Sequence, residues 1–210
     1  MDLTAKLTGN KAVFLDLDNT LYPYAPCHRH ALRKSHAAYR RIIGPIAWRV
    51  FLKRYESARG IIHRRLKGQA ASHSRLLYFQ AMLESAGETK ICRRALQLEN
   101  IYWGSFLRWV KFYPWVRPFL AECKRRGKRV LIVTNLTSGI QMRKVRRFRL
   151  EAWIHALVTS EEAGAEKPHP KIFRLALKKA HCKPREIFSV GDDPGDAAPF
   201  GEFFRVRSKT

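Results

Sequence analysis

The chain has 210 residues, which is long enough for one sizeable core or for one core with a smaller appended module. Hydrophobic residues make up 46% of it, and this share excludes a wholly disordered chain. The longest apolar runs, such as VLIV at 130–133, are far shorter than the ~20 residues of a membrane-spanning helix. The 41 Lys and Arg against 17 Asp and Glu leave a formal charge of +24, so the expected partners are anions: phosphorylated metabolites, nucleic acid or an acidic membrane surface.

The N-terminal segment and the cysteines indicate a cytoplasmic protein. Residues 1–11 lack a basic stretch followed by an apolar one, so no secretory signal is expected. Cys27, Cys92, Cys123 and Cys182 are widely spaced and form no CxxC pair. We therefore predict four buried free thiols rather than disulfides or a cysteine metal site.

The first predicted element is a strand at 12–18 (AVFLDLD), an apolar run that ends in two carboxylates. A continuous apolar run of this length fits a strand buried on both faces, as in a parallel sheet. Such a strand gains nothing from paired negative charge, so Asp16 and Asp18 are expected to serve a functional site. Thr20 is expected to cap the turn that follows.

Residues 25–111 are predicted to be a helical module. The segments 30–43, 47–62 and 74–87 carry apolar residues three and four positions apart, the spacing of amphipathic helices. Between residues 25 and 83 there are 13 Lys or Arg and a single acid, Glu56. The module is therefore strongly basic.

Beyond residue 111, helix-like segments alternate with short apolar runs that fit buried strands. In chain order these segments are 114–126, 129–135, 138–148, 156–160, 168–180 and 187–192. The alternation predicts an α/β fold, an open parallel sheet with helices on both faces. After Asp196, FFRV at 203–206 is the sole strand candidate.

Polar residues stand at the carboxyl ends of the predicted strands, where open α/β sheets bind ligands. They are Asp16, Asp18, Thr134, Asn135, Ser160, Asp192, Asp193 and Asp196. Lys167 stands just before the helix at 168–180. Mg²⁺ takes protein carboxylates together with substrate oxygen and water, and a phosphoryl group in transfer needs positive charge around its oxygens. These residue types predict a site for Mg²⁺ and a phosphoryl group.

Four short motifs resemble those of the haloacid dehalogenase (HAD) superfamily, and they occur in that superfamily's order. They are DLDNT at 16–20, TN at 134–135, the lysine of EKPHPKIF at 166–173 and GDDPGD at 191–196. The resemblance covers most of the chain outside 25–111. It implies a Rossmann-like core with an open parallel sheet.

The resemblance also implies a role for each matching residue. Asp16 would be the nucleophile that forms an aspartyl-phosphate intermediate. Asp18 would protonate the leaving oxygen and later take a proton from the attacking water. Thr134 and the backbone of Asn135 would hold the phosphoryl oxygens, and Lys167 would neutralise charge between the nucleophile and the substrate.

The implied Mg²⁺ ligands are Asp16, the backbone carbonyl of Asp18, and Asp192. Either Asp193 or Asp196 would complete this set, and the sequence leaves the choice between them open. Asp-Asp-Pro-Gly-Asp also suits a turn.

An insertion directly after the first motif is a cap in this superfamily, of the C1 type when it is helical. The resemblance therefore implies a catalytic core of residues 1–24 and 112–210 and a basic, all-helical cap of residues 25–111. A cap that closes over the site disfavours polymers and favours a small anionic phosphoester. Both a sugar phosphate and a nucleotide are candidates.

Other chemistries of the superfamily are weighed against phosphomonoester hydrolysis. A haloacid dehalogenase has no use for a second acid at Asp18. A phosphonatase needs a cap lysine, and Lys34, Lys53 and Lys67 are not distinguished from one another. A phosphomutase stays open.

A hypothesis of a different class is a HAD-fold protein whose basic module binds nucleic acid or a partner while turnover is incidental. The presence of Asp16, Asp18, Lys167 and Asp192 together argues against it. The Lys and Arg of the module are spread around its helices, so we expect weak, non-specific nucleic-acid binding at most. The oligomeric state stays open.

Overall fold

The computed structural model describes residue 3, residues 5–196 and residues 202–206. The chain divides into two compact units: an α/β unit of residues 1–24 and 111–210, and a helical unit of residues 25–110. Residue 111, placed in the helical module by the sequence, belongs to the α/β unit. In the described part of the chain, no helix combines the length and the apolar character needed to cross a membrane.

The sheet of the α/β unit has the strand order β3-β2-β1-β4-β5, and every neighbouring pair is parallel. Its described strands are β1 (Ala12–Leu15), β2 (Arg129–Thr134), β3 (Ala156–Thr159), β4 (Ile187–Gly191) and β5 (Glu202–Arg205). Each predicted apolar run forms a strand, and the candidate at 203–206 becomes the edge strand β5. The predicted open parallel α/β fold is therefore confirmed.

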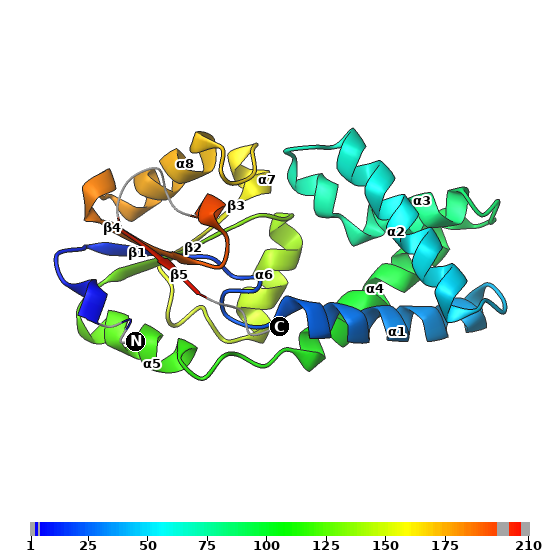
Figure 1. Ribbon diagram of the computed structural model, residues 1–210, viewed down its shortest axis with the longest axis horizontal. Coiled ribbons are helices and arrows are strands. Elements are labelled where there is room, and N and C mark those ends of the chain that lie inside the picture. The colour runs from blue at the N-terminus through cyan, green and yellow to red at the C-terminus, as the bar shows by residue number, and fades with distance from the viewer. Residues whose placement is uncertain (1–2, 4, 197–201, 207–210) are drawn as a thin grey trace. The chain divides into compact units, whose positions relative to one another are not determined.

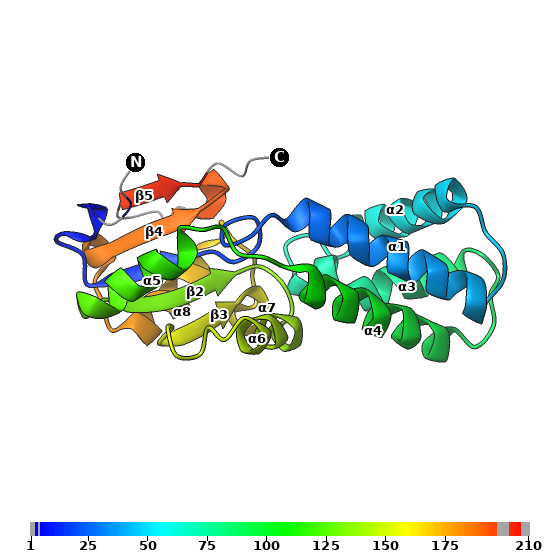
Figure 2. The same cartoon turned by 90° about the horizontal axis from the view of Figure 1, so that it is seen from below.

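Helices cover both faces of this sheet, with α5 on one side and α8 on the other (Figures 1 and 2). The helices of the unit are α5 (Val116–Arg125), α6 (Ser138–Arg147), α7 (Ser160–Ala163) and α8 (Pro170–Ala180), with 3-10 turns η1 (Ala5–Leu7), η3 (Pro184–Glu186) and η4 (Pro194–Asp196). In α5 the buried residues are Val116, Phe119, Leu120 and Cys123. Their spacing of three and four positions gives the helix one apolar face for the sheet.

The core between the sheet and α8 is built from apolar side chains of both. Phe14 of β1 and Leu131 of β2 belong to one buried cluster with Ile172 and Phe173 of α8. β1 is buried along its whole length because β2 and β4 flank it and helices cover its faces. The strand that carries the first acidic motif is thus the central strand of the sheet.

The helical unit encloses an aromatic core. Its helices are α1 (Tyr24–Ile42), α2 (Trp48–Arg65), α3 (Arg75–Glu84) and α4 (Ile91–Trp109), with the 3-10 turn η2 (Ala70–His73) between α2 and α3. Tyr55, Phe79 and Tyr102 are fully buried, and the ring of Phe79 lies 5.5 Å from Tyr55 and 6.3 Å from Tyr102. Each of the three predicted amphipathic segments overlaps a helix of this unit.

The four cysteines are free thiols, as the spacing predicts. Cys27 and Cys123 are buried, whereas Cys182 is half-buried and Cys92 is exposed. The prediction of burial was therefore wrong for Cys92, which is exposed in the first turn of α4, and was met only in part by Cys182.

Candidate active site

The carboxyl ends of β2, β1 and β4 meet at one edge of the sheet because the three strands are parallel neighbours. This edge carries Thr134, Asp16 and Asp192, which directly follow or end those strands. The backbone N–H of Asp16 donates to the carbonyl of Val190 at 2.9 Å, so the β1–β4 pairing continues to the acidic residue itself. Residues far apart in sequence are brought together here.

Asp16 is buried, with 8% of its surface exposed. One of its oxygens accepts a hydrogen bond from Lys167 Nζ at 2.7 Å, and the other accepts one from Thr20 Oγ1 at 2.9 Å. Burial raises the pKa of Asp16 to about 7, with Asp196 and Asp18 acting in the same direction and Lys167 against them. Additional positive charge beside this carboxyl group would favour its ionised form.

Three carboxylates gather at this edge. Asp16, Asp192 and Asp196 each offer an oxygen within 4.8 Å of the other two. Burial, and after it the charge of Asp196, raises the pKa of Asp192. Clustered carboxylate oxygens that disfavour one another's ionisation fit Mg²⁺, because a divalent cation with oxygen ligands removes that repulsion.

Asp193, the alternative to Asp196 in the sequence analysis, is exposed. Its carboxylate accepts from the backbone N–H of Gly195 at 2.7 Å and so stabilises the turn. Asp196 instead folds back against the end of β4, where a side chain on Gly191 would overlap its carboxylate. A glycine at 191 makes room for Asp196 in the acidic cluster.

Lys167 is held in place from both its side chain and its backbone. Its ammonium group contacts Asp16 and Asp196, and it is almost fully buried. Burial alone would lower the pKa of Lys167, but the two carboxylates raise it, so the group stays charged. The side chain of Asn135 accepts from the Lys167 backbone N–H at 2.8 Å and donates to its carbonyl at 3.3 Å. Asn135 of the second HAD motif thereby fixes the backbone at Lys167 of the third.

Asp18 is surrounded by donors that the sequence analysis did not single out. Lys144 Nζ lies 2.7 Å from both of its oxygens, Tyr22 donates to one oxygen, and Gln141 Nε2 is 3.3 Å from the other. Although burial favours the neutral acid, Lys144 and the other donors lower the pKa of Asp18. The contacts of Asp18 with these donors thus favour its ionised form.

The sequence contains a signal that Gln141 and Lys144 have buried polar partners. Both are buried and share one face of α6 with the apolar residues Ile140 and Val145. Helical spacing places a polar amide and an ammonium group on an apolar face, where they require buried partners. That mismatch was the available signal.

Thr20 does not have the role expected from its sequence. It is fully buried, donates to Asp16 and lies 3.3 Å from an oxygen of Asp192. A hydroxyl group between the buried carboxylate of Asp16 and the half-buried carboxylate of Asp192 reduces their repulsion, so Thr20 supports the acidic cluster rather than capping a turn.

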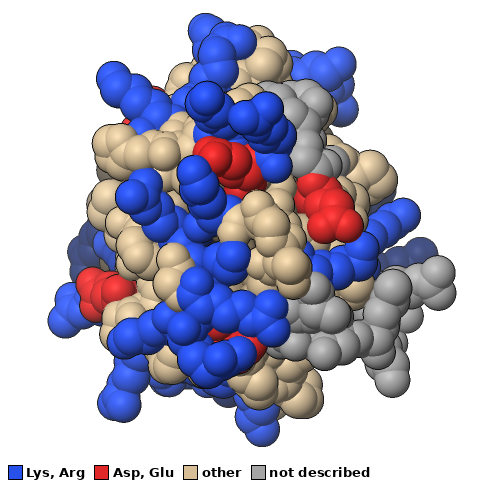
Figure 3. All heavy atoms as spheres, turned by 90° about the vertical axis from the view of Figure 1, so that its left-hand side faces the viewer, with Lys and Arg blue, Asp and Glu red and all other residues tan. Residues whose placement is uncertain are grey.

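Basic side chains also lie at the opposite edge of the sheet. Figure 3 shows the face where the strands begin, with Lys and Arg side chains spread across it. The last turns of α5 and α8, both basic, are at this end, and cations stabilise helix C-termini. The positive charge here thus has a structural reason.

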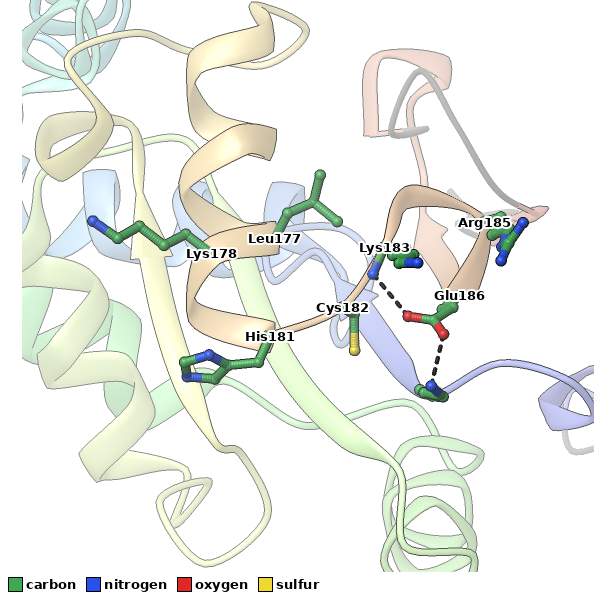
Figure 4. A pocket seen from close by; sticks show the side chains of 8 residues that line it. Leu177, Lys178, His181, Cys182, Lys183, Arg185 and Glu186 are labelled. Carbon is green, nitrogen blue, oxygen red and sulfur yellow. Dashed lines mark hydrogen bonds and ion pairs between the residues drawn. The ribbon is translucent and has the colours of Figure 1, made fainter.

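An open hollow of about 700 Å³ lies at the same end, beside the starts of β1 and β4 (Figure 4). Its lining includes Lys11, Lys178 and Arg185, and Lys11 is paired with Glu186 at 2.7 Å. Lys178 and Arg185 lie at opposite ends of it, so these two cations do not converge on one point. The hollow is separate from the acidic cluster at the carboxyl ends.

The profile of the haloacid dehalogenase-like hydrolase family matches residues 10–202. The chain belongs to this family. The predicted resemblance and the prediction of a hydrolase are therefore confirmed, and the HAD motifs coincide with the residues gathered at the carboxyl edge.

Among curated relatives, a ribulose-1,5-bisphosphate 5-phosphatase of Halopiger xanaduensis is 35% identical over 182 residues, covering 87% of this chain and 76% of the relative. A glyceraldehyde 3-phosphate phosphatase of Methanopyrus kandleri is 32% identical over 182 residues, covering 87% and 75%. Among solved structures, a 2-haloacid dehalogenase from Pseudomonas syringae pv. Tomato DC3000 superposes with a TM-score of 0.73 at 23% identity, covering 91% of this chain and 84% of that one. A HAD phosphatase from Thermococcus onnurineus gives 0.69 at 20% identity, covering 95% and 87%. The structural matches establish the shared fold.

Proposed function

We propose that this HAD-family hydrolase is a Mg²⁺-dependent phosphatase of small phosphorylated metabolites. The observation that carries the proposal is the placement of the buried Asp16 between Lys167 and the acidic partners Asp192 and Asp196. This combination offers a nucleophile, a fixed cation and a set of metal ligands at one edge of the sheet. The two curated phosphatase relatives support the same conclusion.

The reaction takes two displacement steps on the residues of this chain. A carboxylate oxygen of Asp16 attacks phosphorus, the bond to the leaving oxygen breaks, and Asp18 donates a proton to that oxygen. Water then attacks phosphorus and gives a proton to Asp18, and the bond between phosphorus and Asp16 breaks to release inorganic phosphate. The contacts of Lys144 favour the ionised Asp18, which is the form needed in the second step.

The chain's own residues bind the phosphoryl group in this proposal. Lys167 stays charged beside Asp16 and neutralises the phosphoryl oxygens. Thr134, buried at the end of β2, and the backbone of Asn135 donate to those oxygens. Their fixed positions reduce the reorganisation needed when charge develops.

The fit of the acidic cluster to a divalent cation supports Mg²⁺ as the cofactor. The ion would be held by Asp16, Asp192, Asp196 and the backbone carbonyl of Asp18. Asp193 would not bind the ion and would only stabilise the turn in which it lies. When bound, Mg²⁺ supplies positive charge to the phosphoryl oxygens and to the carboxylate nucleophile.

The substrate is proposed to be a small phosphorylated sugar or related metabolite. The relatives are named for ribulose-1,5-bisphosphate and glyceraldehyde 3-phosphate, and Asp18 provides the acid that an alkoxide leaving group needs. The helical unit is proposed to act as a cap that selects the leaving group. A nucleotide monophosphate is the second substrate class to compare.

Phosphate release from a panel of sugar phosphates, triose phosphates and nucleotides, with and without Mg²⁺, tests this function. We expect Mg²⁺-dependent turnover with a preference for a small phosphorylated sugar. Turnover of a 2-haloacid, or no phosphate release from any phosphoester, would contradict the proposal.

The charge of +24 is proposed to attract small anionic substrates without forming a specific nucleic-acid site. Such steering acts over a Debye length of about 10 Å at 0.1 M salt. We expect kcat/KM to fall as ionic strength rises while kcat stays nearly constant. Tight, salt-resistant binding of one DNA or RNA structure in competition with substrate would favour a nucleic-acid-binding function instead.

A further inference from the structure

Helix α6 carries two polar side chains that are completely buried, Gln141 and Lys144. They stand three positions apart and therefore project from the same face of the helix. Buried amides and ammonium groups are retained where they have specific partners. The partners of both residues lie where the carboxyl ends of β2, β1 and β4 meet, the edge of the sheet that is here called the catalytic edge.

Gln141 contacts the phosphate-binding motif. Its amide nitrogen lies 2.7 Å from Thr134 Oγ1 and 3.0 Å from the carbonyl oxygen of Asn135. The opposite amide orientation would place the Gln141 oxygen against the Asn135 carbonyl and near the carboxylate of Asp18, where oxygen would repel oxygen. The amide nitrogen therefore donates to Thr134.

This hydrogen bond determines whether the Thr134 hydroxyl group donates or accepts toward a bound phosphate. A hydroxyl group that accepts from Gln141 keeps its own hydrogen for another acceptor. The acceptor seen in the structure, the carbonyl of Asn135, is 3.4 Å away, which is long for a hydroxyl donor. A phosphoryl oxygen at the catalytic edge is a better acceptor, so Gln141 prepares Thr134 as a donor to phosphate.

The orientation of Gln141 leaves its own oxygen unsatisfied. Among the described residues, this buried oxygen has no hydrogen-bond partner. Leaving a buried acceptor unpaired disfavours folding, and a residue placed only for stability would avoid it. The arrangement is consistent with a function of the donor end of the amide.

Lys144 acts on the other catalytic group. Its ammonium group is equidistant from the two oxygens of Asp18, while the Asp18 side chain itself is 26% exposed. Tyr22, four residues after Asp18, donates to one oxygen of the same carboxylate. A carboxylate held by donors on both oxygens has a fixed rotation, so Lys144 and Tyr22 determine which way Asp18 faces.

We propose that Gln141 and Lys144 are positioning residues through which one helix sets both the phosphate donor Thr134 and the carboxylate of Asp18. The inference rests on the proposed phosphatase function and extends it beyond the residues of the four motifs. Gln141 acts on phosphate binding, and Lys144 acts on departure of the leaving group. A purely structural role would instead weaken both properties together with stability.

The first experiment measures binding of inorganic phosphate by calorimetry in the presence of Mg²⁺. Gln141→Leu should weaken phosphate binding by about tenfold, because Thr134 loses the donor that orients it. Gln141→Asn keeps the amide but shortens its reach, and should show a similar loss. Val145→Ala, a buried change on the same helix without a polar contact at the site, should leave phosphate affinity unchanged. Unchanged affinity in both Gln141 variants, or a wild-type protein that binds no phosphate, would overturn the inference for Gln141.

The second experiment compares single-turnover rates on p-nitrophenyl phosphate and on an alkyl phosphate. Lys144→Met should slow the alkyl phosphate by about a hundredfold, because an Asp18 that is free to rotate no longer faces the leaving oxygen, and should slow p-nitrophenyl phosphate much less, because its leaving group needs little protonation. Loss of the Lys144 charge alone would favour the protonated Asp18 and would not slow the alkyl phosphate. Lys144→Gln, which keeps one donor, should be intermediate and provides a second variant if the first does not fold. Equal losses on both substrates would overturn the role of Lys144.

The two experiments separate this inference from the proposed function. An active wild-type enzyme whose Gln141 and Lys144 variants behave like Val145→Ala would refute the inference alone. A wild-type protein that hydrolyses no phosphoester would refute the proposed function, and the phosphate-binding measurement would still decide the role of Gln141.

Discussion

The two units of the molecule differ in what they bury. The α/β unit encloses ionisable groups at the end of its sheet, including Asp16, Lys144 and Lys167. The interior of the helical unit is apolar and rich in aromatic rings such as Tyr55 and Phe79, and the buried charge among its described residues, Arg75, lies over aromatic rings. Ring packing stabilises a fold by removing apolar surface from water, whereas buried charges add little net stability. The contrast indicates that the buried charges of the α/β unit are retained for function.

Replacing Asp16, the proposed nucleophile, should lower activity far more than it lowers stability. We expect Asp16→Asn to lower Mg²⁺-dependent phosphatase activity at least about a thousandfold, because the covalent step is lost. The free energy of unfolding should change by only about 1 kcal/mol, since Lys167 keeps its contact with Asp196. Activity assays and denaturant unfolding of the same preparations measure both quantities.

Glu151→Gln is the matched control, because it removes a carboxylate from the exposed surface of the α/β unit. It should retain wild-type activity. Substantial activity in Asp16→Asn would remove Asp16 as the nucleophile.

Truncating a ring of the helical unit should have the opposite effect. Phe79→Ala should lower the free energy of unfolding by about 3–5 kcal/mol, because a fully buried ring is replaced by a cavity. Leu96→Ala, at a position with 48% exposure on α4, should change it by less than about 0.5 kcal/mol. Denaturant unfolding followed by circular dichroism measures both. A loss below 1 kcal/mol in Phe79→Ala would show that the aromatic core does not determine the stability of this unit.

The turn that contains Asp193 and Asp196 tests which of these two carboxylates contributes to Mg²⁺ binding. Asp196→Asn should weaken Mg²⁺ binding by about tenfold or more, because its oxygen belongs to the cluster with Asp16 and Asp192. Asp193→Asn makes the same change of charge three positions away, and an asparagine oxygen can still accept from Gly195. Its Mg²⁺ affinity should stay within about twofold of wild type. Equal losses in calorimetric titrations would mean that only the overall charge of the turn matters.

A further expected effect concerns a titratable group in the aromatic interior, His28. His28 lies 2.5 Å from the hydroxyl group of Tyr102, and burial lowers its pKa from 6.5 to about 4. Between these two pH values the unfolded chain binds a proton that the folded state does not. Stability is therefore fully present above pH 6.5 and is lost as the pH falls toward 4.

At pH 5 this linkage corresponds to about 2 kcal/mol. His28→Gln removes the titration, so its free energy of unfolding should decrease less than that of wild type between pH 7 and pH 5. Identical pH dependence in the two proteins would show that His28 is not the group responsible.

The sequence by itself determined the elements and the residue types of the site. Short apolar runs predicted the strands because a strand buried on both faces needs apolar side chains throughout, and β1 is buried along its length. Polar residues directly after those runs predicted the catalytic edge, because parallel strands place their carboxyl ends together. Asp16, Thr134 and Asp192 could be named for this reason, and Lys167 for its place in EKPHPKIF just before a predicted helix.

Only the tertiary structure decided between residues of the same type and found their supporting partners. Asp193 and Asp196 are equivalent in a sequence, and the close approach of the chain at Gly191 decides which carboxylate joins the cluster. Lys144 is one of 41 basic residues, and only the packing of α6 against the catalytic edge buries its charge beside Asp18. Local sequence fixes periodicity and residue type, whereas the burial and pairing of a charge depend on which distant segments meet around it.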